Sequence, residues 1–95
     1  MAAYVVFIRD SITDPAGMED YAAAAGKARG DHKIERLVFY DPCEALEGPP
    51  VDGVVIVKFE DMAAAKAWYY SDAYQAAAKI RQRSADYRVI LTEGV

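Results

Sequence analysis

Four segments rich in β-branched and aromatic residues alternate with two helical segments along the chain. The β-rich segments are residues 3–9, 33–40, 54–59 and 87–92. They give the order strand, helix, strand, strand, helix, strand, which is the pattern of two split βαβ units on one antiparallel sheet. Since 95 residues suffice for one core and leave none for a second, we predict a single α+β domain over residues 1–95.

Capping signals set the ends of the predicted helices. Asp14 followed by Pro15 begins the first helix, which should end at Gly30. Asp61 is the expected cap of the second helix. This helix should bend or restart near Ser71-Asp72, because Asp72 and Gln75 have the spacing of a helix cap and its return partner.

Composition and charge exclude several classes of partner. The chain is 54% hydrophobic, carries a formal charge of -4 and has a pI near 4.8, so its surface repels phosphate backbones and anionic lipids. An RNA-recognition domain has the same topology, but residues 54–59 lack its basic and aromatic pattern. The apolar run at residues 1–8 is too short for a membrane span or signal peptide. The lone Cys43 fits a reducing cytoplasm, which is the predicted location.

The first and third predicted strands are apolar on both faces. Strand side chains alternate, so Val5 and Phe7 point to one face while Val6 and Ile8 point to the other. Two helices can cover only one face of a four-stranded sheet. We therefore predict a symmetric homodimer through the uncovered sheet face.

Motifs spread along most of the chain resemble a known family. The Trp-Tyr-x-Ser-xx-Tyr spacing is the most specific of them, and Asp-Pro and Glu-Gly pairs accompany it. The residues that carry the resemblance are Asp14-Pro15, Tyr21, Glu47-Gly48, Phe59, Ala65, Trp68-Tyr69, Ser71, Tyr74, Arg81 and Glu93-Gly94. Together they resemble domain-of-unknown-function family 1330, part of the dimeric α/β-barrel superfamily.

The resemblance implies a ferredoxin-like βαββαβ sandwich, with two helices on one face of a four-stranded antiparallel sheet and two protomers packed sheet to sheet. Members of the family commonly carry Gly-Gly after the first helix and Arg-Gly-Gly near the second strand. Here those stretches read Gly30-Asp31-His32-Lys33 and Phe39-Tyr40-Asp41. Relatives in the superfamily range from cofactor-free oxygenases to isomerases and haem proteins, so the fold alone implies no reaction.

Arg81 is the strongest candidate for ligand binding. Tyr74, Ala77, Ala78 and Arg81 share one helical face, which places a fixed positive charge beside small side chains and an aromatic ring. A bound carboxylate or enolate could neutralise that charge. An internal ion pair with Glu47 or Glu93 would do so equally well, and this alternative stays open.

Three further residues near Arg81 are ligand-binding candidates: Trp68, Ser71 and Tyr74. Aromatic rings at helical spacing usually form core, so Trp68 and its neighbour Tyr69 have a structural alternative. Ser71 has no base beside it in the sequence, which favours a backbone role at the helix bend over a nucleophilic one.

The candidates for proton transfer are His32, Tyr4 and Tyr21. A solvated loop position is the alternative for His32. One histidine without matching Cys or acidic spacing does not predict a metal site, and no other feature of the sequence argues for haem or another cofactor.

The sequence leaves two functions open. In the first, the protein binds or transforms, without a cofactor, a small apolar and possibly anionic molecule in a pocket between helices and sheet. In the second, the homodimer itself is the functional unit, as a structural or interaction module.

Overall fold

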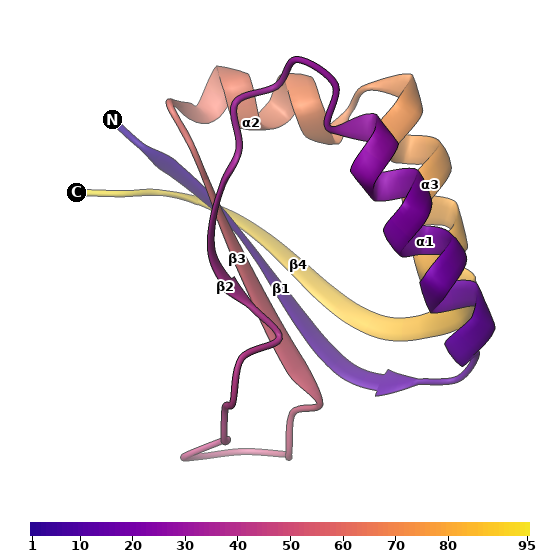
Figure 1. Cartoon of the computed structure of the whole chain (residues 1–95). Helices are drawn as coiled ribbons and strands as arrows, with labels where there is room; N and C mark the ends of the chain where they lie inside the picture. Colours follow the sequence, from indigo (N-terminus) through magenta and orange to yellow (C-terminus); the bar gives the residue numbers. More distant parts are fainter.

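The computed structural model describes all residues from 1 to 95 and contains every predicted element (Figure 1). The second helical region divides in two, so the chain has three helices. The elements are β1 (Ala3–Ile12), α1 (Pro15–Ala28), β2 (Glu35–Phe39), β3 (Gly53–Phe59), α2 (Met62–Tyr69), α3 (Asp72–Ser84) and β4 (Ala85–Glu93).

The four strands form one antiparallel sheet in the order β2-β3-β1-β4. This order is that of the ferredoxin-like fold. Strands β1 and β4 are longer than predicted because their pairing continues past a β-bulge between Arg9 and Ser11, out to Ile12 and Ala85. No helix of the fold is both long enough and apolar enough to cross a lipid bilayer.

The helical region breaks at Ser71, one residue before the predicted cap. The Ser71 hydroxyl accepts a hydrogen bond from the backbone N–H of Tyr74 and donates one to the carbonyl oxygen of Trp68, at 3.2 and 2.7 Å. Gln75 reaches back to the carbonyl of Tyr69 at 2.7 Å. The hydroxyl therefore serves both helix ends at the junction, which explains why the break occurs here.

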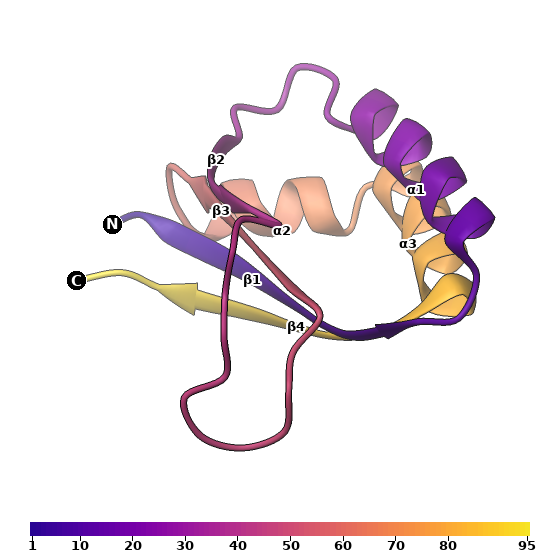
Figure 2. The same ribbon diagram turned by 60° about the horizontal axis from the view of Figure 1, so that its bottom comes forward.

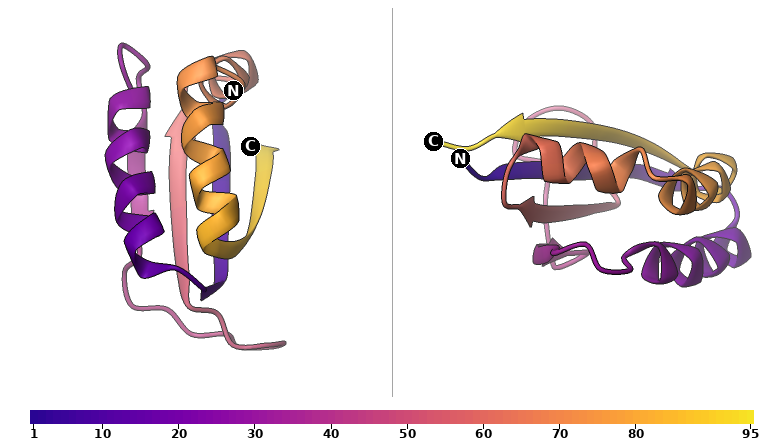
Figure 3. Two further views of the ribbon diagram at one scale, coloured as in Figure 1. Left: turned by 90° about the vertical axis from the view of Figure 1, so that its right-hand side faces the viewer. Right: turned by 90° about the horizontal axis from the view of Figure 1, so that it is seen from above.

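All three helices lie on one side of the sheet (Figure 1). Helix α1 packs along α3 and makes few direct contacts with the strands (Figure 3). The core under the helices is formed by inward-facing strand residues and by the apolar faces of α2 and α3. Its largest members are Val5, Phe7, Val55, Val57, Phe59, Trp68 and Tyr74.

The opposite sheet face has no covering element in the protomer. Val6 lies at its centre and pairs with Ile56 on β3 and Ile90 on β4. Ile90 is 47% exposed. Tyr4, Ile8 and Val54 belong to the same face, so it is largely apolar, as the alternation of the sequence predicted.

The chain termini meet at one end of the sheet, where the Gly94 N–H donates to the Ala2 carbonyl at 2.8 Å. The β2–β3 connection, residues 40–52, extends away from the sheet near the other end (Figure 2). It carries Leu46, which is exposed.

Candidate ligand-binding cavity

A cavity of about 450 Å³ lies between α1, β2 and the helix-covered face of the sheet. Its floor includes Phe7 of β1 and Val55 and Val57 of β3. Ala22, Ala25 and Gly26 of α1 line another wall, and their small side chains leave space because α1 rests on α3 rather than on the sheet. The volume is that of an ordinary small-molecule site.

Aromatic rings dominate the lining. Six of them come from five different parts of the chain: Phe7, Tyr21, Phe39, Tyr40, Trp68 and Tyr74. Trp68 and Tyr74 are close neighbours, with ring centroids 4.1 Å apart. Such a lining favours a flat apolar ligand.

Charged residues line the cavity beside β1, β2 and the end of α1. Arg9, Arg29 and Arg36 are the cations, and Glu19 is the one carboxylate. Arg9 pairs with Asp52, whose carboxylate lies 2.6 Å from its Nε atom. Arg29 donates to the carbonyl of Ile34, and Arg36 stacks over the Phe39 ring, with Cζ 4.6 Å from the ring centroid. Neither Arg29 nor Arg36 has a carboxylate partner, so the cavity is electropositive.

Sequence reasoning missed these arginines. Arg9 continues the inward alternation of Val5 and Phe7 along β1, so the period of the strand could have placed it beside the helices. Arg36 was harder to place, because the β-bulge between Arg36 and Val38 interrupts the alternation of β2.

Tyr40 forms one corner of the cavity in an unusual backbone conformation. Its φ of +56° lies in the left-handed region, which non-glycine residues seldom adopt. The Arg9 guanidinium lies 4.2 Å above its ring, and its hydroxyl hydrogen-bonds that of Tyr87. A Cβ atom on Gly53 would lie 2.7 Å from the Tyr40 ring, so this glycine makes room for it. Such local strain persists where surrounding contacts fix the conformation.

The hydroxyls of Tyr21 and Tyr74 hydrogen-bond each other at 2.7 Å beside Trp68. Burial raises the pKa of Tyr21, and the adjacent Tyr74 adds to the shift. Burial likewise raises the pKa of Tyr74. Both phenols are therefore neutral at physiological pH and act as hydrogen-bonding groups rather than bases.

Arg81 is buried behind the cavity and does not line it. The residue is 3% exposed, and its Nε has no hydrogen-bond partner. Its Cζ lies 5.2 to 5.9 Å from the ring centroids of Tyr87, Phe7 and Tyr21. The ion pair with Glu47 or Glu93 that the sequence left open does not form. Burial would lower the pKa of Arg81, but the phenol oxygens of Tyr74 and Tyr21 outweigh it, so the guanidinium stays charged.

The structure separates the remaining sequence candidates from the cavity. Ser71 caps α3 and is not part of the lining. Tyr4 is on the open sheet face, opposite the helices. His32 lies in the loop after α1, where its backbone N–H donates to the Arg29 carbonyl at 2.9 Å. Of the seven candidates, Tyr21, Trp68 and Tyr74 come together in the lining.

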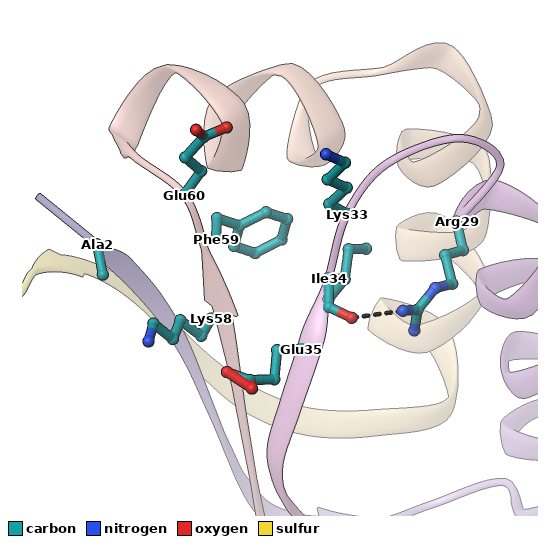
Figure 4. Close-up of a pocket in the computed structure, with 8 residues that line it drawn as sticks. All are labelled: Ala2, Arg29, Lys33, Ile34, Glu35, Lys58, Phe59 and Glu60. Atoms are coloured by element: carbon teal, nitrogen blue, oxygen red, sulfur yellow. Dashed lines mark hydrogen bonds between the residues drawn. The ribbon is translucent and has the colours of Figure 1, made fainter.

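A second hollow, of about 440 Å³, shares Arg29 and Ile34 with the first and extends between the 29–34 loop and the end of β3 (Figure 4). It has mixed charge, from Arg29, Lys33, Lys58, Glu35 and Glu60. Phe59 is its one aromatic side chain. It is thus less suited to an apolar ligand. No group of three or more His, Cys, Asp or Glu side chains in the chain is placed to hold a metal ion.

The sequence matches the model of a domain of unknown function, DUF1330, over residues 2–95. The chain belongs to the DUF1330 family. A comparison of the sequence with curated proteins finds no match. Membership of the family confirms the resemblance but assigns no reaction.

Solved structures with the same fold include two of unknown function. A Rhodopseudomonas palustris protein is 22% identical, with a TM-score of 0.68 over 99% of this DUF1330 chain and 82% of its own. A dimeric ferredoxin-like protein from Thermobifida fusca is 13% identical, with a TM-score of 0.64 over 97% and 90%. SnoaB, a cofactor-independent oxygenase from Streptomyces nogalater, is 13% identical, with a TM-score of 0.62 over 99% and 92%. These similarities confirm the fold.

Three tyrosines with raised pKa values, Tyr21, Tyr40 and Tyr74, predict a loss of stability at alkaline pH for this DUF1330 protein. In the unfolded chain a tyrosine ionises near pH 10, whereas in the folded state burial holds all three protonated to higher pH. The folded state then binds more protons, so the free energy of unfolding should fall as pH rises above about 10. Urea unfolding between pH 8 and 11 measures this fall. Tyr21→Phe should reduce the slope, and Tyr70→Phe, at an exposed position, should leave it unchanged.

Proposed function

We propose that this protein binds a small, flat, largely apolar molecule with an anionic group in the cavity between α1, β2 and the sheet. The observation that carries the proposal is the composition of the lining, which combines six aromatic rings with three guanidinium groups and one carboxylate. Empty voids inside protein cores are apolar, whereas this cavity has charged groups in its lining and exposed residues at its border.

The charge balance supports an anionic group on the ligand. Asp52 neutralises Arg9, and Glu19, which is exposed like Arg29 and Arg36, forms no ion pair with either of them. Arg29 and Arg36 keep unpaired guanidiniums at the lining, and buried Arg81 adds a third uncompensated charge behind it. A ligand carboxylate or enolate would neutralise this excess positive charge and accept charge-assisted hydrogen bonds from the guanidinium groups at the lining. In this way Arg81 favours an anion through its charge, without touching the ligand.

The cavity supports binding more directly than proton-transfer catalysis. Its phenols have raised pKa values, and of the sequence candidates for proton transfer only Tyr21 reaches it. A cofactor-independent reaction in this site would use Tyr21 as a hydrogen-bond donor to a developing negative charge, in the manner of an oxyanion hole. The cofactor-independent oxygenase among the structural neighbours makes this extension worth testing.

We also propose that the functional unit is a homodimer formed through the open sheet face, acting in the cytoplasm. The support is the apolar strip around Val6, Ile56 and Ile90, together with structural neighbours that are described as dimeric. An exposed free thiol at Cys43 fits a reducing compartment.

The ligand class is tested by titrating 2-naphthoate and its neutral amide, 2-naphthamide, against wild type by calorimetry. We expect the carboxylate to bind more tightly. Arg36→Gln should weaken naphthoate by about ten- to a hundredfold, since a hydrogen bond to a charged group contributes roughly 1.5 to 3 kcal/mol. The amide should be little affected.

Arg83→Gln is the matched control, because it removes the same charge from an exposed position at the end of α3 outside the cavity. It should leave both affinities unchanged. Equal affinity of the two compounds for wild type, or equal effects of the two substitutions, would contradict an anion site at Arg36.

A further inference from the structure

Two aromatic residues that line the cavity, Trp68 and Tyr21, have hydrogen-bond donors without a protein acceptor. Trp68 is 6% exposed and lines the cavity, yet its indole Nε1 has no partner. An indole N–H can only donate, so its lack of a partner means that an acceptor is absent. Buried polar groups in native proteins are nearly always paired, and each exception needs an explanation.

The Tyr21–Tyr74 pair supplies a second unused donor. Two phenol hydroxyls hold two hydrogens, and their mutual hydrogen bond consumes one of them. Tyr74 is 0% exposed, and its neighbour Arg81 can only donate, so the Tyr21 oxygen is the acceptor available to the Tyr74 hydrogen. Tyr21 is only half-buried. The arrangement that satisfies both is donation from Tyr74 to Tyr21, which leaves the Tyr21 hydrogen free for a third group.

These donors belong to one aromatic cluster. Trp68 packs on Tyr74 at 4.1 Å between ring centroids, and Tyr74 meets Tyr21 edge-on at 6.4 Å. Arg81 is 5.9 Å behind the Tyr21 ring and has no counter-ion. Its charge strengthens an O–H donor beside it and stabilises negative charge on whatever oxygen accepts the bond. No carboxylate or other acceptor from the protein pairs with the cluster.

We propose that the inner end of the cavity is a subsite for a conjugated carbonyl or enolate oxygen, which accepts a hydrogen bond from Tyr21 beside the Trp68 ring. The inference rests on the proposed function and adds a second recognised group to the ligand. The ligand is then a flat carbonyl compound with its oxygen at the Tyr21–Trp68 end and its anionic group near Arg36. Tyr74 is a positioning residue that orients the Tyr21 hydroxyl.

The test compares two probes of the same shape, 6-acetyl-2-naphthoate and 6-isopropenyl-2-naphthoate, in which a C=CH₂ group replaces the ketone. Wild type should bind the ketone about tenfold more tightly, the usual contribution of a neutral hydrogen bond. Because the chain has one tryptophan, its indole N–H gives a single NMR signal, which should shift more when the ketone binds than when the alkene binds.

Two phenylalanine variants assign the donor. Tyr21→Phe should abolish the preference for the ketone while keeping the affinity for the alkene. Tyr74→Phe should reduce the preference without abolishing it, because Tyr21 keeps its hydrogen but loses the hydrogen bond that orients its hydroxyl. A preference that persists in Tyr21→Phe would overturn the assignment.

Equal affinity for both probes, with equal indole shifts, would overturn the subsite while leaving the anion site intact. Failure of both probes to bind wild type would contradict the proposed function and the subsite together. The two failures are thus distinguishable.

Discussion

Val6→Asp should convert the protein from a dimer to a monomer. Val6 sits at the centre of the open sheet face, between Ile56 and Ile90 on the neighbouring strands. In a sheet-to-sheet dimer the new carboxylate would be buried without a partner, which costs several kcal/mol. A penalty of about 4 kcal/mol weakens association roughly a thousandfold. Light scattering over micromolar concentrations measures the change.

Ala76→Asp is the control for the added charge, because Ala76 is exposed on α3, on the helical side of the sheet. It should leave the dimer intact. A compact wild-type monomer at these concentrations would contradict the dimer itself. A Val6→Asp dimer as stable as wild type would place the interface elsewhere.

Trp68→Ala should lower the free energy of unfolding by about 3 to 5 kcal/mol, the usual cost of truncating a buried tryptophan. Trp68 is 6% exposed and packs against the rings of Phe7, Phe59 and Tyr74. Removing the ring deletes the contacts that α2 makes through Trp68 with Phe7 and Phe59 on the sheet. Urea unfolding monitored by circular dichroism measures the loss.

Tyr70→Ala is the matched control, since Tyr70 lies two residues further along and is 69% exposed. We expect a change within about 0.5 kcal/mol. A Trp68→Ala loss no larger than that of Tyr70→Ala would show that the Trp68 ring is dispensable for the core.

The sequence predicted the fold because strand alternation and helical spacing are both patterns of residues that are near one another in the chain. Alternation in β1 and β3 divided their side chains into two apolar faces, of which the structure buries that of Val5 and Val57 under the helices, and helical spacing placed Tyr74 and Arg81 on one helical face. The helix break was predicted at the right place, but the cap was assigned one residue late, to Asp72 instead of Ser71, because both are good cap residues. Only the geometry shows the Ser71 hydroxyl bonded to both helices.

The cavity could be predicted only in part. Tyr21, Trp68 and Tyr74 follow from helical spacing, whereas Arg36 and Tyr40 depend on a β-bulge and on a left-handed backbone, which the sequence pattern does not reveal. The sequence pattern likewise does not show that α1 lies away from the sheet, because this position depends on how α1 packs along α3. For the same reason Arg81 was expected at the ligand, although Tyr21 and Phe7 lie between its guanidinium and the cavity.

The central claim, that the cavity binds a flat apolar anion, is tested most directly by a crystal structure of the protein grown with 2-naphthoate. We predict the ring system between α1 and the sheet, in contact with Trp68 and Phe7, with its carboxylate at Arg36. Naphthoate bound on the open sheet face or in the hollow around Lys33 and Glu60, with the cavity empty, would contradict the account.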